Sequence, residues 1–164
     1  MAETLLFIQK HDFADFDALA DYADAASAKT KELTAKIKAA ESRMAEIAVL
    51  KTHIINYAKT RDIYAAYRKA GYSKKYYDAH ESDIIIHKAA KKAFDDLALK
   101  KLPTVKSLQA EYSDLLVQKK LDYAELSKAR DEAKQLQIYK ANAEMLLRTD
   151  AEEQRQTREH QQEK

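Results

Sequence analysis

The sequence predicts an all-α fold: a long antiparallel coiled-coil helical hairpin that ends in a small helical tip. The 164 residues contain one glycine and one proline, Gly71 and Pro103, so little else in the chain interrupts a helix. Apolar side chains recur at steps of three and four, as in a helix that packs along a partner helix. Two helices of similar length joined by a short connection pack antiparallel. We therefore expect residues 1–164 to form one elongated helical module.

Local signals place the first two helices. A short helix is expected within residues 1–14, mainly in Glu3–Gln9, where it would cover the open end of the hairpin. The first long helix is expected over residues 15–70, because Asp15 can cap its free amides and Gly71 can end it. Its core-facing seam is expected to gain one extra step of three and so to readjust the supercoil locally. The seam positions are Leu33, Ile37, Ala40, Met44, Ile47, Leu50, Ile54, Ala58, Arg61 and Ala65.

A helical tip is expected over residues 71–103. Ser73 can cap a short helical turn that runs through Tyr76 and Tyr77, and a further helix is expected at about residues 81–97. The side chains of that helix expected to face inward are Ile85, Ala89 and Phe94.

The return helix is expected over residues 104–149, opened by Pro103 and Thr104. The matching lengths of the two arms predict that Leu33 lies near Ala143 and Ile54 near Leu121. The seam of the return helix is expected along Leu108, Tyr112, Leu115, Leu126, Ala129, Ala133, Leu136 and Ala143. Residues 150–164 contain one apolar residue, Ala151, so this polar tail is expected to fray or to await a partner.

Composition excludes several kinds of site. The chain has no cysteine, so it can form neither a disulfide nor a thiolate metal site, and the cytoplasm is the natural expectation for it. No run approaches the roughly 20 apolar residues of a membrane span, so membrane insertion is not expected. A single glycine rules out a glycine-rich phosphate loop, and no cofactor is expected. An intramolecular hairpin, hence a monomer, is favoured, although exchange of arms at Gly71 would give a homodimer.

Charge is distributed unevenly along the predicted hairpin. Residues 1–28 carry six acids and one base, and residues 150–164 carry five acids and three bases, so the open end is acidic. Residues 56–106 carry twelve bases and six acids, so the closed end is basic. Six of the ten tyrosines also fall near this end: Tyr57, Tyr64, Tyr67, Tyr72, Tyr76 and Tyr77.

Interleaved bases and tyrosines are typical of a surface that binds nucleic acid, because cations neutralise phosphates and phenol rings can stack on unpaired bases. The alternative is that the tyrosines close the core of the tip while the lysines solvate its surface. Both can hold together, since a packed tyrosine leaves the lysines available. The residues predicted to bind nucleic acid are Lys59, Arg61, Arg68, Lys69, Tyr72, Lys74, Lys75 and Tyr76.

Side chains that could support catalysis or a metal are few. His80 and His87 could share one helix face, but a metal site needs three or four converging ligands at tight spacing. Adjacent acids such as Asp95 and Asp96 point to different faces of a helix, so they cannot act together as an acid and a base. We therefore expect neither a catalytic residue nor a metal site.

Three segments carry a resemblance to a known family. They are LKTHIINYAKTRD at residues 50–62, YRKAGYSKKY at residues 67–76 and KLPTVKSLQAEY at residues 101–112. The chain, from Glu3 to about Leu147, resembles the C-terminal region of relaxases, the mobilisation proteins of conjugative and mobilisable elements, such as plasmids and conjugative transposons, of Gram-positive bacteria. In that family an upstream nuclease domain nicks one DNA strand through a tyrosine and a metal-bound histidine cluster. None of its catalytic residues can be carried onto this chain.

The resemblance implies a non-catalytic C-terminal module that assists DNA transfer by contacting DNA at a transfer origin through the basic tip. Two alternatives remain open. The hairpin could bind an accessory or coupling protein of conjugation, or it could be a plain spacer. Affinity for phosphates falls steeply with added salt, whereas apolar helix packing does not, so salt dependence separates DNA contact from protein contact.

Overall fold

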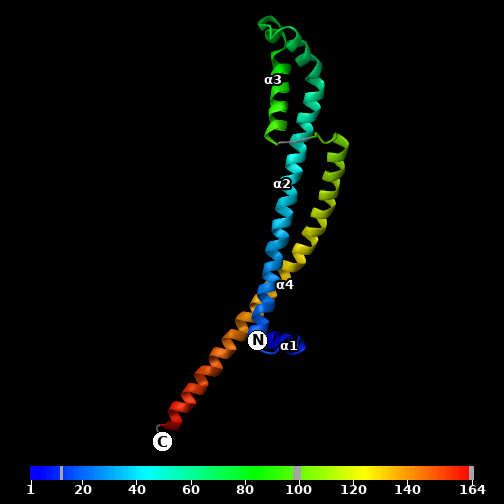
Figure 1. Ribbon diagram of the computed structural model, residues 1–164. Coiled ribbons are helices and arrows are strands. Elements are labelled where there is room, and N and C mark those ends of the chain that lie inside the picture. The colour runs from blue at the N-terminus through cyan, green and yellow to red at the C-terminus, as the bar shows by residue number, and fades with distance from the viewer. Residues whose placement is uncertain (12, 98–100, 163–164) are drawn as a thin grey trace. The chain divides into compact units, whose positions relative to one another are not determined.

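The computed structural model of the protein describes residues 1–11, 13–97 and 101–162, and these ranges hold four helices and no strand (Figure 1). The helices are α1 (Ala2–His11), α2 (Phe16–Lys69), α3 (Lys74–Asp96) and α4 (Val105–Gln162). α2 and α4 pack antiparallel, so the predicted all-α helical hairpin is confirmed. Residues 12, 98–100 and 163–164, which the sequence assigned to the N-terminal segment, the tip and the tail, lie outside the described residues.

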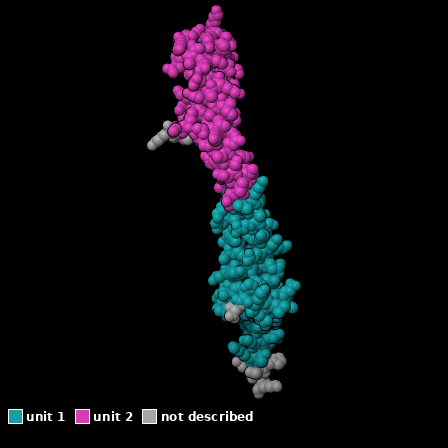
Figure 2. Space-filling view, turned by 90° about the vertical axis from the view of Figure 1, so that its right-hand side faces the viewer, with its two compact units in different colours: residues 1–37, 120–164 teal, residues 38–119 magenta. Residues whose placement is uncertain are grey.

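The chain divides into two compact units, coloured separately in Figure 2. Unit 1 comprises Met1–Ile37 and Lys120–Lys164, and unit 2 comprises Lys38–Lys119. Unit 1 therefore contains α1, the first part of α2 and most of α4. Unit 2 contains the rest of α2, all of α3 and the beginning of α4. The continuous helical pattern of residues 16–69 does not indicate this division.

Unit 1 has a narrow core between α2 and α4, and α1 packs against it. Asn142 donates a 2.8 Å hydrogen bond from Nδ2 to Oγ1 of Thr4, and the ring of Phe7 stacks on Tyr139 with 4.4 Å between centroids. These contacts attach the short N-terminal helix, which is present as predicted, to α4. The buried cluster between the two long helices consists of Leu33, Ile37, Leu126 and Ala129.

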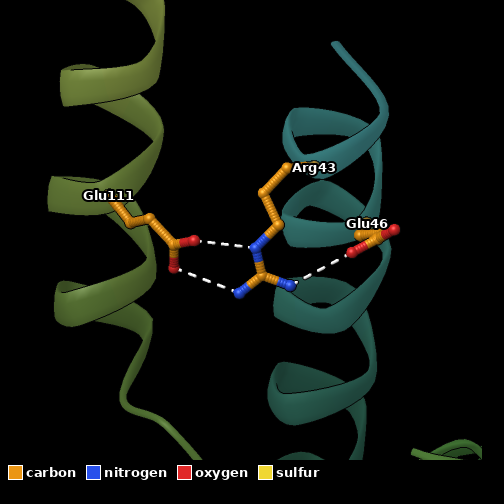
Figure 3. A network of polar contacts seen from close by, with 3 residues as sticks. All are labelled: Arg43, Glu46 and Glu111. Carbon is orange, nitrogen blue, oxygen red and sulfur yellow. Dashed lines mark hydrogen bonds and ion pairs between the residues drawn. The ribbon is translucent and has the colours of Figure 1, made fainter. Parts of the chain in front are cut away.

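Three helices meet in unit 2. The guanidinium of Arg43 on α2 donates two hydrogen bonds to Glu111 on α4, at 2.7 and 3.2 Å, and one to Glu46 at 3.1 Å (Figure 3). Because a two-bonded guanidinium and carboxylate fix each other's distance and direction, this contact favours one register of α4 against α2. The buried cluster of the unit draws on all three helices and consists of Ile47, Leu50, Ala90, Phe94 and Leu108.

The predicted helix boundaries follow local sequence signals. Asp15 caps α2, since the amide of Ala18 donates a 2.9 Å hydrogen bond to its Oδ1. Thr104 caps α4 in the same way, through a 3.0 Å bond from the amide of Ser107. Gly71 follows the end of α2 with a φ of +62°, in the left-handed region that glycine enters without steric cost. These three boundaries are confirmed.

The predicted register of the hairpin is wrong. Leu33 packs with Leu126 and Ala129, whereas the sequence placed it near Ala143. The difference amounts to about four helical turns.

The cause of the register shift is α3. This helix runs back beside the last turns of α2, where His87 contacts Thr60, instead of capping the end of the hairpin. α4 therefore first meets α2 well before Gly71. Ile54 consequently packs against the cluster that contains Leu108, rather than near Leu121 as predicted.

Several predicted core positions are also wrong. Ala58, Arg61 and Ala65 of α2 are exposed, as is Tyr112 of α4. Beyond Ile54 the face of α2 that carries the tyrosines is buried instead, because α3 packs against that face. The buried or half-buried side chains there are Tyr57, Thr60, Tyr64 and Tyr67.

The face that α3 buries differs from the prediction at two of the three expected positions. Ile85 and Ala89 were expected inside and are exposed, whereas Phe94 is buried as predicted. Three consecutive isoleucines at residues 84–86 let the periodic pattern fit more than one face. The side chains that α3 buries are Ile84, His87, Ala90 and Phe94. The predicted break between a first turn and the main helix corresponds to a kink at His80, whose φ is −133°.

α4 extends through Gln162, so the predicted end of the return helix at residue 149 is wrong. The segment contains neither glycine nor proline and is rich in strong helix formers. All side chains from residue 151 to 159 are exposed. The helix therefore continues here without a core to pack on.

Candidate nucleic-acid interface

Four of the predicted cations surround the turn between α2 and α3, at the top of Figure 1. Arg68 and Lys69 lie in the last turn of α2, and Lys74 and Lys75 lie in the first turn of α3. We call these four residues the cap cluster. All four side chains are exposed, and none takes part in an ion pair with any residue that the structure describes. Their positive charge is therefore available to a ligand.

The other two predicted cations lie apart from the cap cluster. Lys59 and Arg61 are exposed on α2, roughly 10–14 Å before Arg68 along the helix axis. Arg61 is paired with Asp62, with 3.2 Å between Nε and Oδ1. The structure thus brings together four of the six predicted cations and leaves two on the side of the helix.

A tight turn connects the two halves of the cap cluster. The amide of Tyr72 donates a 3.0 Å hydrogen bond to the carbonyl of Tyr67, and the amide of Gly71 donates a 3.0 Å bond to the carbonyl of Arg68. This pair of bonds is the Schellman arrangement that commonly ends helices. Tyr72 also has a positive φ, +59°. The turn holds the end of α2 close to the start of α3.

The start of α3 adds to the positive potential. Ser73 occupies the N-cap position, as predicted, but its side chain makes no capping hydrogen bond. The first turn contains no acid to offset the helix dipole. Lys74 and Lys75 therefore lie beside a helix end that is itself positive, and Arg68 and Lys69 lie beside the negative end of α2, which favours them.

Most of the tyrosine side chains of the tip pack in its core, as the packing alternative predicted. Tyr57 and Tyr64 stack on His87, with centroid distances of 4.5 and 4.3 Å. Tyr67 is buried, with 8% of its surface exposed. Tyr76 is half-buried and packs on the His80 ring at 4.4 Å. Among the tyrosines predicted to bind nucleic acid, Tyr72 is the exposed one.

His87 is a buried polar group that the sequence did not single out for this position. Its Nδ1 lies 3.0 Å from Oγ1 of Thr60, and that hydroxyl donates its only proton to the carbonyl of Asn56 at 2.7 Å. The Thr60 oxygen therefore accepts a hydrogen bond from the Nδ1–H group, so neutral His87 carries its hydrogen on Nδ1. Burial, followed by the nearby charge of Lys91, lowers the pKa of His87 from its usual 6.5.

The lowered pKa of His87 makes stability depend on pH. Below about pH 6.5 the unfolded chain binds a proton at this position more readily than the folded chain does, so the free energy of unfolding decreases as the pH falls. We expect urea unfolding at about pH 7.5 and pH 5.5 to show a larger loss of stability in the wild-type protein than in His87→Phe. The comparison cancels the titration of the other histidines. Equal losses in the two proteins would contradict this prediction.

Unit 2 also contains an apolar groove that the sequence did not reveal. It lies between α2 and the end of α3, and the exposed side chains of Val49 and Leu97 contribute to it. Glu46 and Asp96 stand among its lining residues. An apolar groove of this kind is the feature of the structure most relevant to the protein-contact alternative.

The described residues hold neither a candidate metal site nor a candidate membrane span. No group of three or more histidine, cysteine or acidic side chains in those residues could hold a metal ion. In the same residues, no helix combines the length and the apolar character needed to cross a bilayer.

Comparisons of the chain with protein-family models, curated proteins and solved structures found no match.

Proposed function

We propose that this chain is a non-catalytic helical module that binds DNA through the cap cluster. The observation that supports this most directly is the placement of Arg68, Lys69, Lys74 and Lys75 around one tight turn, exposed and without ion-pair partners among the described residues. Cations in this arrangement neutralise phosphates and release the counterions that surround DNA.

The wider context of the proposal comes from the sequence resemblance. In a relaxase or mobilisation protein, a module of this kind would hold DNA at a transfer origin while an upstream domain performs the nicking reaction. The segment YRKAGYSKKY, at residues 67–76, supports both parts of the proposal, because it belongs to the resemblance and contains the whole cap cluster. Contact with an accessory or coupling protein, or a plain spacer role, is the alternative.

Charge reversal tests the proposal. Fluorescence anisotropy with short DNA oligonucleotides should show binding that weakens steeply as salt is added, and the variant Lys69→Glu, Lys74→Glu, Lys75→Glu should bind at least about tenfold more weakly. The matched control reverses three exposed lysines elsewhere: Lys31, Lys38 and Lys134. Because both variants change the net charge equally, a specific loss in the first assigns binding to the cap cluster.

Two results would contradict the proposal. Equal losses in the two variants would mean that DNA responds only to net charge. Absence of binding by the wild-type protein even at low salt would favour protein contact, with the groove near Val49 as the first surface to mutate, or a spacer role.

A further inference from the structure

Tyr72 occupies a backbone conformation that a large side chain rarely adopts. Its φ is +59°, directly after Gly71 at +62°. The left-handed region brings Cβ close to the following carbonyl, so such positions usually contain glycine, asparagine or aspartate. A tyrosine here raises the energy of the folded chain, and residues held in such conformations cluster at functional sites.

The consequence of this conformation is an exposed ring in a defined orientation. Tyr72 has 57% of its surface exposed, the largest value among the tyrosines of the chain. Its ring meets the buried ring of Tyr67 nearly at right angles, with 5.2 Å between centroids and an interplanar angle of 85°. Because Tyr67 is fixed in the core, it restrains Tyr72 before any ligand binds. Less rotational freedom is then lost on binding.

The ring lies between the two halves of the cap cluster along the chain. Arg68 and Lys69 precede it, and Lys74 and Lys75 follow it within three residues. The four cations have no ion-pair partner among the residues that the structure describes, so their charges are available to phosphates. An exposed aromatic ring between phosphate-binding cations is the combination that binds single-stranded nucleic acid, since unpaired bases stack on the ring. The bases of a duplex are already stacked on one another and are not available to it.

We propose that Tyr72 is a stacking platform for an unpaired base, and that it gives the cap cluster a preference for single-stranded over duplex DNA. This inference rests on the proposed function, because it requires that the cap cluster binds DNA. It assigns separate roles to the four cations and to the ring of Tyr72. The four cations supply affinity for any DNA strand, and Tyr72 supplies the selection of the unpaired form.

The variant Tyr72→Asn separates these roles. Asparagine tolerates a positive φ, so the fold should be retained or stabilised. We expect affinity for a short single strand to fall about 5- to 150-fold, as for removal of one stacked base, while affinity for a duplex of the same length changes little. Tyr72→Phe should retain the preference, because the ring and not the hydroxyl does the stacking.

A spectroscopic test reports the stacking itself. The chain has no tryptophan, so Tyr72→Trp introduces a single tryptophan at the turn. Its emission should be quenched by single-stranded DNA and much less by duplex DNA. The control is Tyr112→Trp, which places the same fluorophore on α4 of the same unit, where neither ligand should quench it.

The outcomes distinguish the stacking role of Tyr72 from DNA binding by the cap cluster. If the wild-type protein binds both forms of DNA equally and Tyr72→Asn leaves both affinities unchanged, the role of Tyr72 is overturned and DNA binding by the cap cluster stands. If the wild-type protein binds neither form, both proposals fail together. Quenching of Tyr72→Trp by duplex as strong as by single strands would also overturn the stacking role.

Discussion

Replacing Ile37 with aspartate is expected to lower the free energy of unfolding of unit 1 by about 4 kcal/mol or more. Ile37 has 4% of its surface exposed and packs with Leu33, Leu126 and Ala129 between α2 and α4. The new carboxylate would lose its hydration in a cluster whose members are all apolar, and burial of an unpaired charge is among the most destabilising single changes. Urea unfolding followed by circular dichroism would measure the loss.

The control for this change is Ala35→Asp. Ala35 is exposed two residues earlier on the same helix, so its replacement adds the same charge without burying it. We expect a cost of about 1 kcal/mol or less for the control, because aspartate has a lower helix propensity than alanine. A similar cost at the two positions would show that Ile37 does not face α4, and it would disprove the observed seam of unit 1.

The second large effect concerns two adjacent isoleucines of α3. Ile84 is fully buried, with 0% of its surface exposed, whereas Ile85 is 50% exposed. Ile84→Ala should lower the free energy of unfolding by about 2–5 kcal/mol, because it removes buried methyl groups and leaves a cavity. Ile85→Ala should cost much less, because it vacates space that solvent already reaches.

This pair forms its own control, since residue type, helix and substitution are identical. The measurement is again urea unfolding of both variants beside the wild-type protein. A larger cost at Ile85 than at Ile84 would mean that α3 buries the face that the sequence suggested. That result would contradict the observed packing of α3 on α2.

The parts of the fold that could be predicted are those that local chemistry determines. Asp15 and Thr104 cap helices through bonds to amides three residues later, and Gly71 takes a left-handed conformation, so neighbouring residues suffice to place these boundaries. The pairing of helices depends instead on which distant segment fills the space beside α2. Nothing near Leu33 in the sequence indicates that α3 occupies the end of α2 and shifts α4 by several turns.

The residues of the candidate site also differ in how far the sequence alone predicts their placement. The exposure of the cations in the cap cluster can be predicted from the sequence. Lysine and arginine are almost never fully buried, and a short turn segment has no core of its own to bury them. The difference between Tyr67, which is buried, and Tyr72, which is exposed, depends on the path of the turn between them. The pattern of tyrosines at residues 64, 67, 72 and 76 contains no information about that path.

The sequence separation of the contacts implies an order of folding for the two units. In unit 2, Thr60 contacts His87 across 27 residues and Arg43 contacts Glu111 across 68. In unit 1, Lys140 contacts Asp24 across 116 residues and Asn142 contacts Thr4 across 138. Because closing a longer loop costs more entropy and slows folding, unit 2 is expected to form first.

The placement of unit 2 within the sequence also affects folding during synthesis on the ribosome. All residues of unit 2 precede residue 120, so this unit can fold while the chain is still growing. Unit 1 also needs residues that follow Lys119, so it must wait for that part of α4. Until Leu126 and Ala129 have been synthesised, Leu33 and Ile37 lack the α4 side chains that bury them, and the N-terminal part of α2 presents its apolar seam to solvent or to a chaperone.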